Sequence, residues 1–247
     1  MATAIDPRLV TLTAPDTFAA ERYQGLRLKL EQLRAEKALR VIAVTSPGAG
    51  DGKTLTSINL AGVLARESDA KILLIDADLR RSSVSVQLGI DAGTPGLADL
   101  IAGPPSPTNG AGSGGASSKG TLTGLIRRPH TCGFDVLPAG SSSRSVQKLF
   151  RAERFTQIIA EARERYDYVL LDTPPLVPVY DAAVLARQVD GVILVVAAGK
   201  TPRKLLGAAL DLLDASKVVG LVFNDDTSPL FGYSDRAYRP YFTSARA

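Results

Sequence analysis

A glycine-rich segment that ends in Gly-Lys-Thr carries residue types suited to binding a nucleotide. We predict that the nucleotide contacts come from eight consecutive residues: Gly48, Ala49, Gly50, Asp51, Gly52, Lys53, Thr54 and Leu55. The glycines let backbone N–H groups converge on phosphate oxygens, and the start of a following helix adds partial positive charge. We expect Lys53 to reach the β- and γ-phosphates and the Thr54 hydroxyl to ligate Mg²⁺. Pro47 stands where the strict GxxxxGK[ST] pattern has glycine, so the match is to the last three positions and the loop composition.

Three aspartates stand where short apolar runs end. Asp76 and Asp78 follow Ile72–Ile75, and Asp172 follows Tyr168–Leu171. If both runs are parallel strands, their carboxyl ends face the same crevice as the glycine-rich loop. Asp76 and Asp78 then point the same way and could serve Mg²⁺ and a nucleophile's proton together, while Asp172 has the place of a Walker B acid. The first two could instead cap the next helix, and this alternative stays open.

Composition indicates a folded domain and excludes several classes of protein. The chain has 247 residues, of which 45% are hydrophobic and 22% charged, which is enough for a large core. The net charge of +4 would permit a nucleic-acid partner, but Lys and Arg are scattered among acids without aromatic interleaving, so we expect none. With one cysteine, no disulfide forms within the chain. No signal peptide or membrane-spanning run is recognisable, so we expect a cytoplasmic protein.

The elements that must position these residues follow from the apolar pattern. Strands buried on both faces are expected over Val41–Thr45, Ile72–Ile75, Tyr168–Leu171, Val192–Val196 and Val218–Phe223, with a shorter strand over Phe134–Leu137. Helices are expected over Thr17–Leu33, Lys53–Arg66, Ser145–Arg165, Asp181–Arg187 and Pro202–Leu213. The implied class is α/β, with a mostly parallel sheet wrapped by helices in the P-loop NTPase fold.

We predict one domain over residues 1–247, with three attached segments. These are an N-terminal helical arm over about 1–38, a flexible insertion over 103–120 and a C-terminal tail over 225–247. The insertion, GPPSPTNGAGSGGASSKG, cannot bury enough apolar surface to offset its ordering entropy, so we expect a mobile surface loop.

Together these motifs resemble the bacterial tyrosine kinases (BY-kinases) of capsule and exopolysaccharide systems. The resemblance covers about four-fifths of the chain and includes SPGAGDGKT, ILLIDADLRR and YDYVLLDTPPLVPVYDAAVLARQVDGVILVV. It implies an ATP- and Mg²⁺-dependent protein tyrosine autokinase that regulates exopolysaccharide synthesis and export. It also implies that Lys53 acts in catalysis, that Thr54, Asp76, Asp78 and Asp172 handle the metal, and that Asn224 lies near the adenine. We expect one aspartate, preferably Asp76, to accept the tyrosine proton.

The resemblance further implies acceptor tyrosines and partners. Kinases of this family end in a tyrosine cluster, and Tyr233, Tyr238 and Tyr241 fall near the end of this chain, where they would be phosphorylated in trans; they could instead dock the tail on the domain. The family's interface motif Glu-x-x-Arg-x-x-Arg appears here as Glu21, Gln24 and Arg27, so assembly of a ring stays open. The expected partners are other copies of the chain and a cytosolic segment of a transmembrane polysaccharide co-polymerase, which would recruit it to the inner face of the membrane.

Two other classes of P-loop protein share some of these features. Partition and septum-site ATPases share the fold, but they carry a signature lysine early in the loop where this chain has Gly48. A non-kinase P-loop ATP switch, acting as a regulatory subunit of the polysaccharide machinery, stays open because Gln24 and the sparse tyrosines fit it.

Overall fold

The computed structural model describes residues 5–91, 93–103, 121–141 and 145–225. Most of the insertion predicted over 103–120 and of the tail predicted over 225–247 lies outside the described residues, as do Tyr233, Tyr238 and Tyr241. In the described part of the chain, no helix has both the length and the apolar character needed to cross a bilayer.

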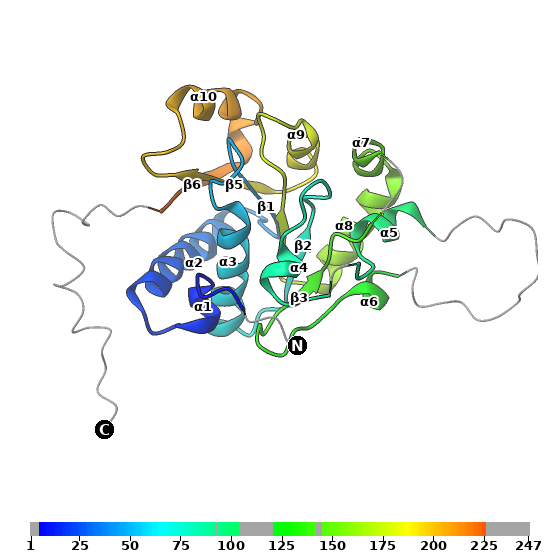
Figure 1. The fold of residues 1–247 in the computed structure, drawn as a ribbon, viewed down its shortest axis with the longest axis horizontal. Helices are drawn as coiled ribbons and strands as arrows, with labels where there is room; N and C mark the ends of the chain where they lie inside the picture. The colour runs from blue at the N-terminus through cyan, green and yellow to red at the C-terminus, as the bar shows by residue number, and fades with distance from the viewer. Residues whose placement is uncertain (1–4, 92, 104–120, 142–144, 226–247) are drawn as a thin grey trace, which may run out of the picture.

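Six parallel strands form one sheet in the order β3-β2-β4-β1-β5-β6 (Figure 1). The strands are β1 (Val41–Thr45), β2 (Ile72–Asp76), β3 (Asp135–Leu137), β4 (Tyr168–Asp172), β5 (Gly191–Ala197) and β6 (Val218–Asn224). The register places Asp76 of β2 directly beside Asp172 of β4. The predicted α/β class, with a parallel sheet, is confirmed.

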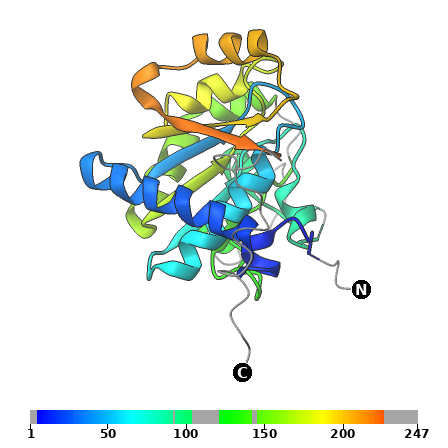
Figure 2. The same cartoon turned by 90° about the vertical axis from the view of Figure 1, so that its left-hand side faces the viewer.

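Helices cover both faces of this sheet, as the two views in Figure 1 and Figure 2 show. One face is covered by α1 (Val10–Thr13), α2 (Phe18–Glu36), α3 (Lys53–Glu67) and α4 (Val84–Gln87). The other is covered by α5 (Leu97–Ala102), α6 (Leu122–Leu125), α7 (Val146–Phe150), α8 (Glu153–Arg165), α9 (Asp181–Ala186) and α10 (Arg203–Asp211). Along β1, Val41 and Ala43 enter one core and Ile42 and Val44 enter the other. Burial on both faces explains why the central strands are unbroken apolar runs.

The helix predicted over Ser145–Arg165 is wrong in one respect, because the structure has two helices there. The chain leaves the helical conformation at Ala152 (ψ 138°) before α8 begins. This break lets Phe150 and Phe155 meet edge to face, with ring centroids 5.4 Å apart, in the same buried cluster. On one continuous helix these positions would point about 140° apart, so packing of the two rings favours the break.

The prediction that β6 is buried on both faces is also wrong. Leu221 is 41% exposed and Phe223 is 60% exposed, whereas Val219 and Val222 pack against the core shared with α2 and α3. Within the described residues β6 pairs only with β5, so it is the last strand of the sheet. An apolar run cannot by itself distinguish a central strand from an edge strand.

Candidate active site

The loop between β1 and α3 has a backbone shape suited to phosphate. Gly50 (φ 88°) and Gly52 (φ 95°) adopt left-handed conformations that residues with a Cβ rarely adopt. A Cβ on Gly52 would lie 2.0 Å from Asn224 Nδ2, so only glycine fits there. Ala49 and Gly50 are exposed at the loop tip, and α3 begins at Lys53. The loop therefore leads into a helix N-terminus, whose unpaired N–H groups favour an anion.

Side chains from three segments fix this loop. The buried Asp51 carboxylate accepts hydrogen bonds from the backbone N–H of Gly48 (2.9 Å) and from the Thr201 hydroxyl (2.8 Å). Asn224 Nδ2 donates to the Asp51 carbonyl oxygen at 3.1 Å. The Asp51 side chain therefore turns back on the loop, Asn224 lies against it, and Leu55 packs partly against the core.

Lys53 and Thr54 face acids from two neighbouring strands. The Lys53 ammonium lies 2.9 Å from Asp78 Oδ2, with side chains 12% and 4% exposed. The Thr54 hydroxyl donates to Asp172 Oδ2 at 2.7 Å and accepts from the Ser83 hydroxyl at 3.0 Å. The structure thus brings together the phosphate-loop residues and the strand-end acids that the sequence singled out.

Asp76 and Asp78 also accept hydrogen bonds from backbone N–H groups, and one of those to Asp76 comes from the start of α4. Asp76 accepts from the N–H of Val84, the first residue of α4, at 3.2 Å and from the N–H of Asp78 at 3.3 Å. Asp78 Oδ1 accepts from the N–H of Arg81 at 3.0 Å. Asp76 is fully buried and its two oxygens face backbone, whereas Asp78 also faces Lys53. Shaping the segment between β2 and α4 is therefore one role of both carboxylates.

Burial and mutual repulsion perturb this acidic group. Burial above all, and then the charge of Asp172, raise the pKa of Asp76 to about 8. Burial also raises the pKa of Asp172, against the opposing effects of Lys53 and of the Thr54 hydrogen bond. Burial would lower the pKa of Lys53, but Asp172 and Asp78 outweigh it, so this pKa is raised. The lysine stays charged, and a further cation bound here would stabilise the ionised forms of Asp76 and Asp172.

The oxygen donors around Thr54 suit Mg²⁺, although they form no closed metal cage. Among the described residues, no three Asp, Glu, His or Cys side chains converge closely enough to hold a metal ion alone. The structure thus does not gather Asp76, Asp78 and Asp172 as three direct ligands. Mg²⁺ that arrives with a nucleotide needs only one or two protein oxygens, because phosphates and water supply the rest. The hydroxyl of Thr54 and the acid beside it, Asp172, fit that requirement.

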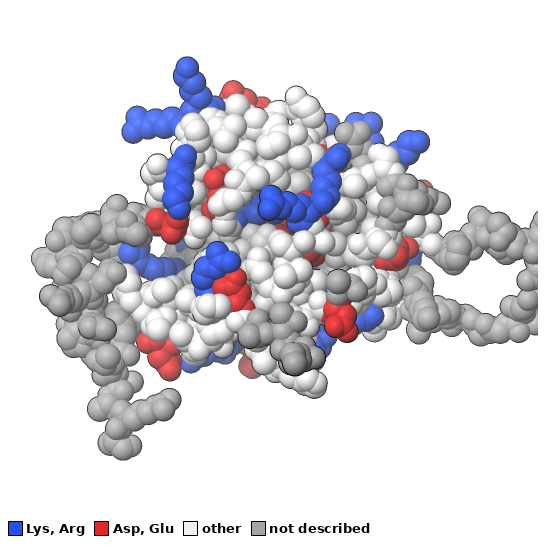
Figure 3. Space-filling view, viewed as in Figure 1, with Lys and Arg blue, Asp and Glu red and all other residues white. Residues whose placement is uncertain are grey.

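An ion pair close to this site was not predicted from the sequence. Arg80 Nε lies 2.6 Å from Asp181 Oδ2, which joins the β2–α4 segment to the start of α9. Arg80 and Arg81 are both exposed. Figure 3 shows a group of Lys and Arg side chains near the centre of the face seen in Figure 1. The position of Arg80 in ILLIDADLRR was visible in the sequence, but no pattern indicated its distant partner.

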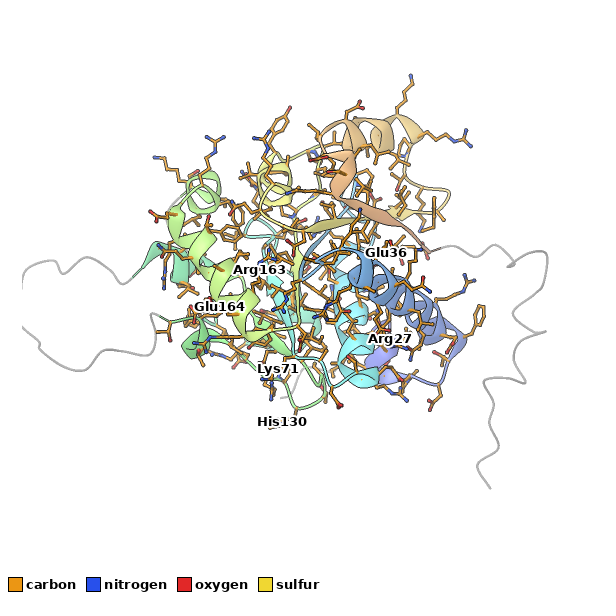
Figure 4. All side chains as sticks on the ribbon, turned by 180° about the vertical axis from the view of Figure 1, so that it is seen from behind. Arg27, Glu36, Lys71, His130, Arg163 and Glu164 are labelled. Carbon is orange, nitrogen blue, oxygen red and sulfur yellow. The ribbon has the colours of Figure 1, made fainter. Side chains whose placement is uncertain are left out.

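The predicted interface residues lie together on α2. Arg27 Nε donates to Gln24 Oε1 at 3.0 Å, and Arg27 also pairs with Glu31 at 2.8 Å. Glu21 is exposed one turn earlier. Figure 4 shows Arg27 and Glu36 on this helix. Arg27 is thus held within its own helix in this structure.

The sheet, the phosphate loop and the strand-end acids define a P-loop ATPase. The family described as "AAA domain" matches residues 39–208, and the chain belongs to that family. It is similar to the tyrosine-protein kinase YwqD of Bacillus subtilis, with 28% identity over 87% of this chain and 85% of the relative. It is 32% identical to the succinoglycan biosynthesis transport protein ExoP of Rhizobium meliloti, over 92% of this chain but 27% of that protein. The kinase domain of the Escherichia coli tyrosine kinase ETK superposes with a TM-score of 0.76 at 28% identity, covering 91% of this chain and 84% of that one. The chain is thus a relative of the bacterial tyrosine kinases.

Proposed function

We propose that this chain is a protein tyrosine autokinase, which transfers the γ-phosphoryl group of ATP to tyrosines on neighbouring copies of itself. The observation that carries the proposal is the meeting of Lys53, Thr54, Asp78 and Asp172 beside the phosphate loop. Phosphoryl transfer needs positioning and charge stabilisation more than covalent help, and this arrangement offers both. The likeness to tyrosine kinases over most of the chain supports tyrosine as the acceptor.

Each group then has a task that follows from its place. The loop amides and the Lys53 ammonium bind and neutralise the phosphates. Thr54 and Asp172 would hold Mg²⁺ together with the phosphates, and the ion would supply further neutralisation of the transferring group. Turning Lys53 toward the phosphates frees Asp78, which is better placed than Asp76 to accept the tyrosine proton because both oxygens of Asp76 face backbone N–H groups.

The acceptors and partners are also proposals. Tyr233, Tyr238 and Tyr241 are the candidate acceptors, and Glu21, Gln24 and Arg27 are the candidate contact between copies. The name of ExoP supports a role in exopolysaccharide synthesis and export. We propose that a cytosolic segment of a transmembrane co-polymerase recruits this chain to the inner face of the membrane.

Intact mass after incubation with Mg²⁺–ATP tests the proposal. We expect phosphate additions that peptide mapping assigns to tyrosine, and none in Lys53→Met. ATP consumption without any phosphate on the protein would instead support the ATP switch, which the replacement of arginine by Gln24 favours.

A further inference from the structure

The ion pair of Arg80 with Asp181 has a feature that packing does not explain. The Asp181 side chain is 1% exposed, while that of Arg80 is 45% exposed. Asp181 Oδ2 receives the arginine at 2.6 Å, but the buried Oδ1 has no hydrogen-bond partner among the described residues. A buried carboxylate with one oxygen unpartnered costs stability, so its retention calls for a functional reason.

The pair connects the two loops whose acids face the phosphate loop. Arg80 belongs to the β2–α4 segment that carries Asp78, and Asp181 begins α9 after the loop that follows Asp172. The hydrogen bond to Asp181 above all, with a smaller contribution from the charge of Asp78, raises the pKa of Arg80. Arg80 and Asp78 are thus near enough for their charges to interact.

Among the described residues, three side-chain hydrogen bonds join this segment to other elements: Lys53–Asp78, Ser83–Thr54 and Arg80–Asp181. The first two use the lysine and the threonine that the proposed function assigns to the phosphates and to Mg²⁺. If a nucleotide and its metal bind Lys53 and Thr54, the Lys53–Asp78 and Ser83–Thr54 contacts should weaken. The pair between Arg80 and Asp181 involves neither group, so nucleotide binding to Lys53 and Thr54 leaves its partners unchanged.

We propose that Arg80 and Asp181 are positioning residues that hold Asp78 in place while phosphate is transferred. The proposal rests on the proposed kinase function and deepens it. The nucleotide is bound by the β1–α3 loop, whose own contacts do not include this pair. Loss of the pair should therefore lower kcat and leave the KM for ATP nearly unchanged.

The test removes both charges at once, in Arg80→Met/Asp181→Leu. Because no carboxylate is left buried alone, this double variant should melt at or above the wild-type temperature. ADP formation and phosphotyrosine are followed over a range of Mg²⁺–ATP concentrations. We expect kcat for both to fall about a hundredfold, the effect of a misplaced reacting group, with the KM for ATP changed by less than about threefold.

A control comes from a second Arg–Asp pair with the same Nε–Oδ distance. Arg128 Nε also lies 2.6 Å from a mostly buried carboxylate, that of Asp135, but this pair lies at the amino end of β3. Arg128→Met should lower the melting temperature without lowering kcat. If this variant loses kcat as well, any lost ion pair disturbs turnover and the assignment to Arg80 and Asp181 is overturned.

Three further outcomes are decisive. Wild-type kcat in the folded double variant would overturn the positioning role. Should the double variant not fold, Arg80→Lys keeps the charge beside Asp181 but not the planar guanidinium, and the proposal then requires a lower kcat in that folded variant. If the wild type forms ADP but places no phosphate on tyrosine, the kinase function fails, while ADP formation still decides the role of the pair.

Discussion

Aspartates at the two ends of the same sheet have pKa values shifted in opposite directions. At the carboxyl end, burial raises the pKa of Asp76 and of Asp172, and neither acid has an arginine partner in the described structure. At the amino end, Asp190 accepts from the backbone N–H groups of Arg40 and Val41 and makes a bidentate pair with Arg163. Burial alone would raise the pKa of Asp190, but these donors outweigh it and the pKa is lowered. Figure 4 shows Arg163 on α8, on this side of the molecule.

The two kinds of carboxylate differ in whether their ionised form stabilises the fold by itself or only with a bound cation. A carboxylate surrounded by donors stabilises the fold once it is ionised. A carboxylate buried beside other acids costs stability until a cation arrives, which is the property a nucleotide–metal site needs. Substitutions at either end of the sheet test this difference.

The largest expected effect is the loss of phosphoryl transfer in Lys53→Met. The Lys53 ammonium is the cation paired with Asp78, and phosphate charge would have no fixed counterion without it. We expect kcat to fall by about a thousandfold or more. Circular dichroism should show that the variant is still folded. Phosphotransfer measured by intact mass at wild-type level would show that the carboxyl end is not the reaction site.

The second effect is on stability, at the amino end. Asp190→Ala removes the acceptor of two backbone N–H groups and of Arg163, and should cost about 2 kcal/mol of unfolding free energy, reduced by partial exposure of the pair. Urea unfolding measures the loss. Because this acid is remote from the phosphate loop, kcat per folded molecule should not change, and a fall in kcat would contradict the comparison.

The two ends should also respond oppositely to pH. Asp76 has a folded pKa of about 8, above its unfolded value of 3.8, so between these values the folded state holds a proton that the unfolded state has released. Its contribution to stability therefore falls as pH rises from about 4 to 8. Asp76→Asn should flatten this decline in melting temperatures taken without Mg²⁺ or nucleotide. An unchanged slope would show that Asp76 is ionised in the free protein.

Asp190 should give the reverse dependence. Its folded pKa lies below 3.8, so its contribution is present above that value and is lost as pH falls further. Asp190→Ala should therefore lose less stability on acidification below about pH 4 than the wild type does. Unfolding curves between neutral pH and pH 3 would measure this, and parallel losses in both proteins would contradict it.

The smallest effect is expected far from both sets of acids. Gly25 lies exposed within α2, and a Cβ built there meets nothing within 4 Å. Gly25→Ala should therefore stabilise the fold by about 0.5–1 kcal/mol, by lowering the entropy lost on helix formation. Gly52→Ala is the matched contrast, because the same added methyl would meet Asn224 in the phosphate loop. If both substitutions shift the melting temperature alike, the loop tolerates a side chain.

The central elements could be predicted because each depends on a local pattern. Buried runs such as Val41–Thr45 appear as strands with the predicted bounds, and α2 begins within one residue of its prediction because Thr17 caps it. The short helices α1, α4, α5 and α6 were not predicted, whereas α9, which also has only six residues, was. Four to six residues give at most a weak helical period. The break before α8 and the exposure of β6 depend on tertiary neighbours.

The candidate site shows the same division. The rule that parallel strands end at one edge was enough to bring Asp76, Asp78 and Asp172 near Lys53. The contact of Arg80 with Asp181 joins residues far apart in sequence, and only the fold sets that distance. The hydrogen bond from the Thr201 hydroxyl to Asp51 was not predicted for the same reason. The roles of these residues in catalysis remain predictions.

The edge position of β6 bears on how the protein opens locally. In the part of the chain that the structure describes, β6 pairs only with β5 and exposes Leu221 and Phe223, so its amides should exchange with deuterated solvent faster than those of β1 or β4. The last residue of this strand, Asn224, touches the loop at Gly52 and donates to Asp51. Local opening of β6 would therefore remove the contact of Asn224 with the phosphate loop. A nucleotide bound in that loop should in turn slow amide exchange along β6.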